Sequence, residues 1–194
     1  FIIMGFLGLL NLVGGLQFSS ESFGTHNFPV TYTMVGTIRG SFYLFIVAVM
    51  AYYSGLLIWR ERRAKINQIY DTMPTKNWTG MAAKFLTVLG TVAVLIAIGI
   101  IAAIIAQALQ GYTRYELGVY LRELLVIDLL AFAFIIALFM LIHALSPNMY
   151  LGFFLCIVVA IANGFVWDAL RVSTNMVEFG AIPGYTLSDM YGYR

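Results

Sequence analysis

The two longest stretches of this chain without a charged residue set the strongest limit on what it can fold into. Asp, Glu, Lys and Arg are all missing between Lys84 and Arg114, and again between Asp128 and Asp168. A helix needs about 20 apolar residues to cross the roughly 30 Å hydrocarbon core of a bilayer. The first stretch is long enough for one membrane-spanning helix, and the second is long enough for two.

The composition excludes the main alternatives to a membrane protein. Of 194 residues, 61% are hydrophobic and 10% are charged, and the mean hydropathy is +0.89. Soluble domains average about 25% charged residues, and a globule of this size could not hide so much apolar surface from water. The same values exclude a disordered chain. We therefore predict an integral membrane protein of the all-α class.

Five segments meet or approach the length of a membrane span, which predicts a polytopic bundle of membrane helices. The predicted spans cover approximately residues 1–16, 41–59, 82–109, 124–145 and 149–170. The chain opens at Phe1 in the middle of an apolar run, so we expect it to be a piece of a longer polypeptide.

The basic residues predict the orientation of these spans. Six of the eleven Lys and Arg residues fall between positions 60 and 84. The positive-inside rule places the 60–81 loop in the cytoplasm, so the 18–40 loop, the 111–123 loop and the 171–194 tail face outside. Nucleic-acid binding would need a broad basic face, and we expect none.

The cytoplasmic loop carries an apolar stripe. Ile66, Ile69, Tyr70 and Met73 follow helical spacing, and Pro74 ends the helix because proline cannot continue its hydrogen bonds. This pattern predicts a short amphipathic helix at the cytoplasmic end of the second span. Two interpretations stay open: a helix lying on anionic lipid, or a docking element for a soluble cytoplasmic partner.

A second stretch with helical spacing precedes the fourth span. Its apolar residues are Leu117, Tyr120, Leu121 and Leu124, and they predict a short amphipathic helix that leads into that span. The ionisable residues Asp128, His143 and Asp168 lie near the ends of spans, where water reaches them. Because the middle of every predicted span lacks a charge, an ion-coupled pump is disfavoured.

Signatures of enzymes and metal proteins are missing from the sequence. It has no Gly-x-x-x-x-Gly-Lys-Ser/Thr phosphate loop. The two histidines, His26 and His143, are predicted on opposite sides of the membrane, and the single cysteine, Cys156, lies in an apolar run. We therefore expect no catalytic residue, no metal site and no cofactor within this chain.

The cytoplasmic loop and its flanks resemble a known family. The pattern consists of Tyr53-Ser54-Gly55, then Trp59-Arg60-Glu61-Arg62-Arg63, then Met73-Pro74 and Asn77-Trp78, with Lys84 at the start of the next span. It is similar to ABC-2 type exporter permeases, and more narrowly to bacterial permeases that can be fused to a gluzincin-type aminopeptidase. Met73-Pro74 stands where that pattern has Leu-Pro.

Weaker matches in the same order extend this resemblance to the end of the chain. They are Gln107-x-x-Gln110-Gly111-Tyr112, Glu116-Leu-Gly118-x-Tyr120, Tyr150-Leu-Gly152 and Ser188-Asp189-Met190-x-Gly192-Tyr193. The family's half-unit has six spans, so the resemblance implies that residues 1–194 are a partial transmembrane permease domain, with a sixth span beyond Arg194. Nothing in this chain supports a peptidase activity.

The resemblance also implies partners and a location. A separate cytoplasmic nucleotide-binding ATPase would drive the permease through the 60–81 loop. A second permease half, or a second copy of the chain, would complete the pathway for an unidentified substrate in the bacterial inner membrane. The residues expected to contact the ATPase are Arg60, Glu61, Arg62 and Arg63, with Ile66, Ile69, Tyr70 and Met73 as the anchoring stripe.

Two other functions compete with transport. The chain could be a non-transporting anchor or assembly subunit of a larger membrane complex, in which case the loop would be only a docking surface. A nucleotide-binding subunit encoded beside it would favour transport. A small intramembrane enzyme is disfavoured because no paired polar groups are predicted at the required depth.

Overall fold

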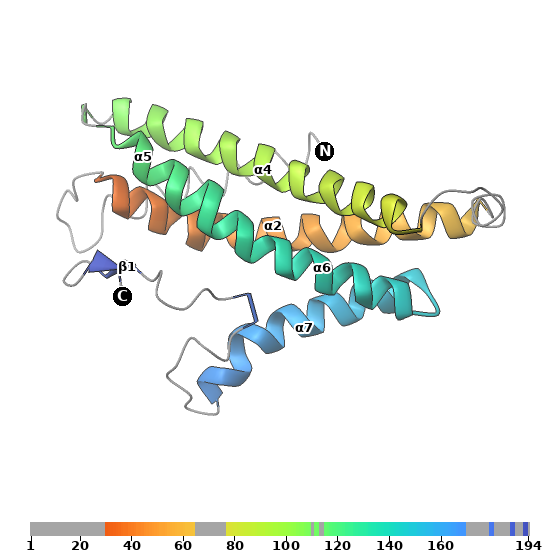
Figure 1. Cartoon of the computed structure of the whole chain (residues 1–194). Helices are drawn as coiled ribbons and strands as arrows, with labels where there is room; N and C mark the ends of the chain where they lie inside the picture. The colour runs from red at the N-terminus through yellow and green to blue at the C-terminus, as the bar shows by residue number, and fades with distance from the viewer. Residues whose placement is uncertain are drawn as a thin grey trace. The chain divides into compact units, whose positions relative to one another are not determined.

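The computed structural model describes residues 30–64, 77–109, 111–112, 115–169, 179–180, 187–188 and 192–193 (Figure 1). The helices are α2 (Thr31–Arg63), α4 (Asn77–Leu109), α5 (Leu117–Tyr120), the π-helix η2 (Leu121–Asp128), α6 (Leu129–Leu145) and α7 (Met149–Ala169). Two short strands, β1 (Leu187–Ser188) and β2 (Gly192–Tyr193), pair antiparallel with Leu187 opposite Tyr193.

Among the described residues, three helices are long and apolar enough to cross a membrane. They span Thr31–Arg63, Trp78–Leu109 and Leu117–Leu145, and a shorter apolar helix covers Met149–Asn163. These helices support the predicted multi-pass membrane protein. The predicted first span, 1–16, lies outside the described residues, so the total of five spans stays a prediction.

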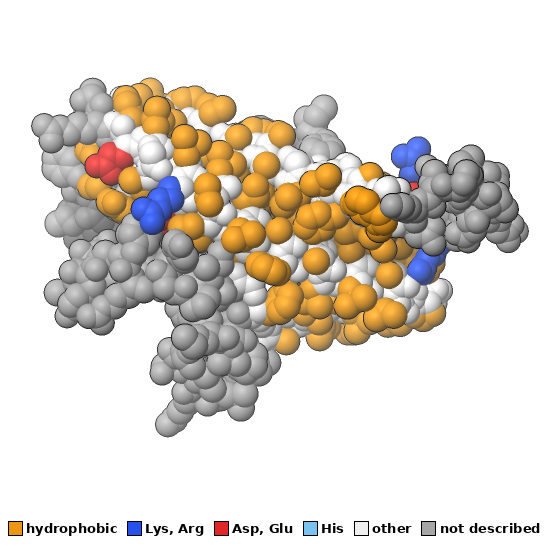
Figure 2. Space-filling view, in the orientation of Figure 1, with side chains coloured by type: hydrophobic (Ala, Val, Ile, Leu, Met, Phe, Trp, Pro, Cys, Tyr) orange, Lys and Arg blue, Asp and Glu red, His pale blue; other side chains and the backbone are white. Residues whose placement is uncertain are grey.

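The surface of the described helices fits a lipid environment. Large apolar side chains such as Leu44, Leu86 and Phe134 are more than half exposed. Figure 2 shows hydrophobic side chains over most of the visible surface of the described helices. Such exposure would be unfavourable in water, whereas in a bilayer these side chains meet hydrocarbon.

The first described helix corrects one prediction. We expected an external loop over 18–40, but α2 begins at Thr31. Residues Met34, Val35, Ile38 and Phe42 are at most 3% exposed and follow helical spacing. The threonines, glycines and single arginine of this stretch lower its mean hydropathy, which is why hydropathy alone placed the beginning of the span too late.

The chain divides into two compact units. Unit 1 comprises residues 1–47 and 91–129, and unit 2 comprises 48–90 and 130–194. In unit 1, Gly99 of α4 faces α2. A Cβ at that position would lie 3.8 Å from Ile38 and 3.9 Å from Phe42, which is ordinary van der Waals contact.

The end of α4 explains one of the weak sequence matches. Gly111 has φ 78°, a conformation that favours glycine. The Gly111 N–H donates to the Ala108 carbonyl at 3.1 Å, and the Tyr112 N–H donates to the Gln107 carbonyl at 3.0 Å, a Schellman-type cap. The side chain of Gln107 accepts a hydrogen bond from the Tyr120 hydroxyl at 3.1 Å, which joins α4 to α5.

The core of unit 2 is built around a buried histidine. His143 of α6 is fully buried, and its ring meets Phe153 edge-on at 5.1 Å between centroids. The ring lies against Gly55 of α2 and Gly152 of α7. A Cβ on Gly55 would lie only 2.7 Å from His143 Cε1, and a Cβ on Gly152 would clash with Nδ1. The two glycines therefore make the space that the imidazole occupies.

This packing predicts that Gly55→Ala destabilises the protein. Because the added methyl group overlaps the imidazole, we expect the free energy of unfolding to fall by about 1–3 kcal/mol. The measurement is thermal unfolding of the purified chain in detergent. Gly36→Ala is the matched control on the same helix, since nothing lies within 4 Å of a Cβ there. Equal unfolding temperatures for Gly55→Ala and Gly36→Ala would contradict this account.

Candidate functional site

The last turn of α2 is tied to two other helices of unit 2. Glu61 forms an ion pair with Lys84 of α4, so the two ends of the 60–81 loop are held together at its base. Both residues belong to the pattern that resembles the ABC-2 permeases. The ion pair is therefore a physical reason for the pattern to have a glutamate at the end of one span and a lysine at the start of the next.

The neighbouring arginine caps another helix. Arg62 Nη2 donates to the Ala144 carbonyl at 2.6 Å, and its Nη1 donates to the Ser146 carbonyl at 3.4 Å. These carbonyls lie at the C-terminal end of α6, where backbone carbonyls have no hydrogen-bond donor within the helix. The Arg62 guanidinium also stacks 5.0 Å from the centre of the Trp59 ring. We call the contacts of Glu61 and Arg62 the α2 joint.

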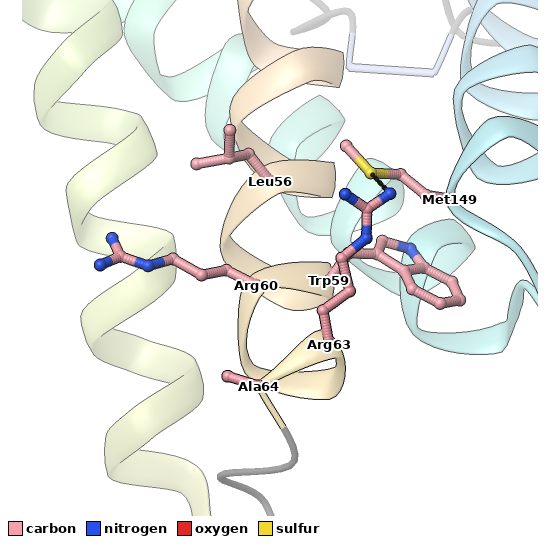
Figure 3. Close-up of a pocket in the computed structure, with 6 residues that line it drawn as sticks. All are labelled: Leu56, Trp59, Arg60, Arg63, Ala64 and Met149. Carbon is pink, nitrogen blue, oxygen red and sulfur yellow. Dashed lines mark hydrogen bonds between the residues drawn. The ribbon is translucent and has the colours of Figure 1, made fainter.

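A pocket lies beside the α2 joint. It has a volume of about 560 Å³ and is lined by Leu56, Trp59, Arg60, Arg63, Ala64 and Met149; we call it the α2 pocket. Figure 3 shows the Arg60 and Arg63 side chains extending to opposite sides of α2, with the Arg63 guanidinium directed to Met149. Arg63 Nη2 lies 3.1 Å from the Met149 sulfur.

The structure describes part of the predicted ATPase-contact set. It places Arg60, Glu61, Arg62 and Arg63 in the last turn of α2. Glu61 and Arg62 are engaged within the chain, whereas Arg60 and Arg63 line the α2 pocket. Contact of these residues with an ATPase stays a prediction. The predicted stripe lies outside the described residues: Ile66, Ile69, Tyr70 and Met73.

A second charged cluster, in unit 1, was not predicted. Arg39 of α2 binds Asp128 in a bidentate contact, with Nε to Oδ2 and Nη2 to Oδ1 both at 2.9 Å. Its Nη2 also lies 2.9 Å from Glu123 Oε2. Arg39 is 37% exposed at its side chain, Asp128 19%, and Glu123 is fully buried. One arginine thus joins α2 to Glu123 and Asp128, two acidic residues of the π-helix η2.

The π-helix explains why sequence spacing missed this cluster. Two of the four residues of the predicted stripe, Tyr120 and Leu124, are buried together with Glu123, whereas Leu117 and Leu121 are more than half exposed. A π-helix has a longer repeat than an α-helix, so it turns a different set of side chains inward. The available signal was a lone arginine close to a predicted span, together with two acids in one short segment.

The other ionisable and polar residues of the predicted spans lie in different surroundings. His143 is part of the core of unit 2. Asn163 binds the backbone of Phe179 through both ends of its amide, at 2.9 and 3.0 Å. The side chain of Asp168 lies outside the described part of the chain. Within the described residues, no group of three His, Cys, Asp or Glu side chains could hold a metal ion.

Comparison with known protein families assigns the chain to a family. The family model described as ABC-2 family transporter protein matches residues 1–163. The chain belongs to this ABC-2 transporter family. It is therefore a membrane permease component of ABC transport and not itself an enzyme. No curated protein and no solved structure matches the chain.

The charged cluster of this ABC-2 permease predicts a stability effect. Arg39→Leu removes the cation that pairs with the buried Glu123 and with Asp128. We therefore expect the free energy of unfolding to fall by about 3 kcal/mol, the low end for a broken buried pair because Arg39 is partly exposed. Adding Glu123→Gln and Asp128→Asn to that variant should recover most of the loss. Thermal unfolding in detergent measures both variants.

Arg39→Lys is the control for charge, because it keeps the cation but cannot make the bidentate contact. We expect the unfolding temperature of Arg39→Lys to lie between those of the parent and Arg39→Leu. If Arg39→Leu unfolds at the parental temperature, the cluster does not hold α2 to the π-helix.

Proposed function

We propose that this chain is the membrane-spanning permease subunit of an ABC exporter in the bacterial inner membrane. A separate cytoplasmic ATPase drives it through the 60–81 loop, and a second permease half or a second copy of the chain completes the pathway. The substrate is not identified by any residue described above. The α2 joint is the observation that best supports coupling through this loop.

The α2 joint would let a force on the loop move the helices that flank it, instead of only connecting them. Because Glu61 and Lys84 close the base of the loop, a force on the 60–81 segment reaches α2 and α4 together. Arg62 passes the same force to the end of α6 through the Ala144 carbonyl. Charge-assisted contacts of this kind are short and directional, so they transmit displacement better than apolar contacts that slide in lipid.

In the proposed cycle, the ATPase subunits dimerise on ATP and push the amphipathic segment of the loop. The apolar stripe would occupy a groove on the ATPase, as helices with apolar anchors commonly do. Movement of the joined helix ends then changes how the permease faces its counterpart and opens a path for the substrate. A passive anchor would need only the docking surface and not the joint.

The first test is directed at the stripe. Ile69→Asp together with Tyr70→Asp places two charges on the predicted docking face, so we expect the ATPase to be lost while membrane insertion is retained. The measurement is co-purification of a P-loop ATPase with the detergent-solubilised protein from its native host, identified by mass spectrometry and by ATP hydrolysis.

Asn67→Asp together with Gln68→Glu is the matched control, because it adds the same charge to the loop away from the stripe. We expect the control to retain the ATPase. Undiminished co-purification with the Ile69→Asp and Tyr70→Asp variant would exclude the stripe as the docking element.

The second test separates coupling from docking. Glu61→Lys and Lys84→Glu each place like charges at the base of the loop, so we expect the ATPase to stay bound while ATP hydrolysis in lipid nanodiscs changes about twofold to thirtyfold, the range of typical coupling energies. The exchanged pair, Glu61→Lys with Lys84→Glu, should restore the parental rate. Hydrolysis unaffected in both single variants would support a passive anchor instead.

A further inference from the structure

The wide turn of the π-helix is confined to η2. On its N-terminal side, the Leu121 N–H donates to the Gly118 and Leu117 carbonyls, three and four residues back. On its C-terminal side, the Leu129 N–H donates to the Val126 carbonyl, three residues back. A π-helix is rare, is mostly a single turn, and is frequent at functional sites. A π-helix of eight residues therefore calls for a specific contact that stabilises it.

Three charged residues of unit 1 supply that contact. Glu123 and Asp128 are five residues apart, and the Arg39 guanidinium binds both of them. Its Nη2 also donates to the Glu123 backbone carbonyl at 3.5 Å. In an α-helix of 3.6 residues per turn, side chains five residues apart point about 140° away from each other. A π-helix bonds residue i to residue i+5, which brings such side chains to one face. The contact of one arginine with both acids therefore favours the π-helix.

The apolar pattern of the same segment favours the α-helical repeat instead. Leu117, Leu121, Leu124 and Asp128 follow one another at spacings of four, three and four residues, which places them on one face of an α-helix. In the structure, Leu117 and Leu121 are 53% and 52% exposed, whereas Glu123 is fully buried. The segment thus has two competing registers, one stabilised by the charges and one by regular hydrogen bonds and the leucines.

We propose that η2 is a two-state segment, which Arg39 holds as a π-helix and which becomes an α-helix when that contact is released. The conversion rotates the helix about its own axis, so Glu123 turns away from α2 while Leu117 and Leu121 turn towards it. Helix shifts between two discrete packings are among the ways in which proteins switch state. The switch goes beyond the proposed permease function, since it requires neither an ATPase nor a substrate.

The arginine decides the register because the other contact of this segment is weaker. The Tyr120 hydroxyl donates to the Gln107 side chain at 3.1 Å, a neutral hydrogen bond that contributes less than the charge-assisted contacts of Arg39. In a permease, the switch would change which side chains the helix presents at the end of a span that we predict to face outside, without unfolding that span.

The test is the rate at which reporter cysteines react with N-ethylmaleimide in the purified full chain in detergent, followed by mass spectrometry. In a Cys156→Ser background, the reporters Leu117→Cys and Leu121→Cys lie at exposed positions of the π register. Arg39→Leu should lower both rates roughly tenfold, which corresponds to about 90% conversion to the α register. A helix bundle that merely loosened would react faster, so a fall in the rate is specific to rotation.

Two matched controls accompany this measurement. Leu44→Cys, at a position of α2 that is 75% exposed, should react equally fast with and without Arg39→Leu. Arg60→Leu makes the same substitution at the other end of α2 and should leave the rate of Leu121→Cys unchanged. The proposal is overturned if Leu121→Cys reacts in the Arg39→Leu variant as fast as in the parent, or faster.

A second variant covers the case in which Arg39→Leu does not fold. Arg39→Leu combined with Glu123→Gln and Asp128→Asn removes the three charges together, so the substitution leaves neither acid charged. The rate of Leu121→Cys should fall in this variant as well, because the leucines and the backbone then decide the register. A parental rate in the folded triple variant would show that the π-helix does not depend on Arg39, and would contradict the proposal.

Discussion

Contacts between charged side chains of different helices are the interactions on which the described structure depends. In a bilayer, apolar side chains gain little by leaving lipid for a neighbouring helix, because both surroundings are equally apolar. Position is therefore specified by close packing and by the few polar contacts. In unit 1, Arg39 joins α2 to the π-helix. In unit 2, Glu61 and Arg62 join α2 to α4 and α6.

Glycines complement these contacts. Gly55 and Gly152 make room for the buried ring of His143 in unit 2. In unit 2, the close packing around His143 and the contacts of Glu61 and Arg62 thus hold the helices together.

Much of the fold could be predicted from the sequence, because hydropathy and length report directly on membrane helices. The bounds and the repeat of individual helices were predicted less well. Hydropathy began the second span too late, at Ser41, since Arg39 was counted as external, and periodicity assumed an α-helical repeat where residues 121–128 form a π-helix. A partner for Arg39 could not be predicted, because 84 and 89 residues separate it from Glu123 and Asp128.

Two residues of the motif that marked the candidate site, Glu61 and Lys84, meet in the structure, whereas contact of this region with an ATPase stays a prediction. Their pairing was not predicted, because spacing along a chain does not show which side chains meet across a loop. We propose the 60–81 loop as the point where an ATPase acts, supported by the family assignment and by the α2 joint. In this proposal the loop and the joint both lie on the cytoplasmic side.

The most direct test of this account is the side of the membrane on which the end of α2 lies. Cys156 is the single cysteine, so a Cys156→Ser background allows one reporter cysteine at a time. Ala64→Cys, next to the α2 joint, should react in intact cells with a membrane-permeant maleimide and resist an impermeant one, whereas Tyr115→Cys should react with both. Labelling of Ala64→Cys by the impermeant reagent in intact cells would contradict the account.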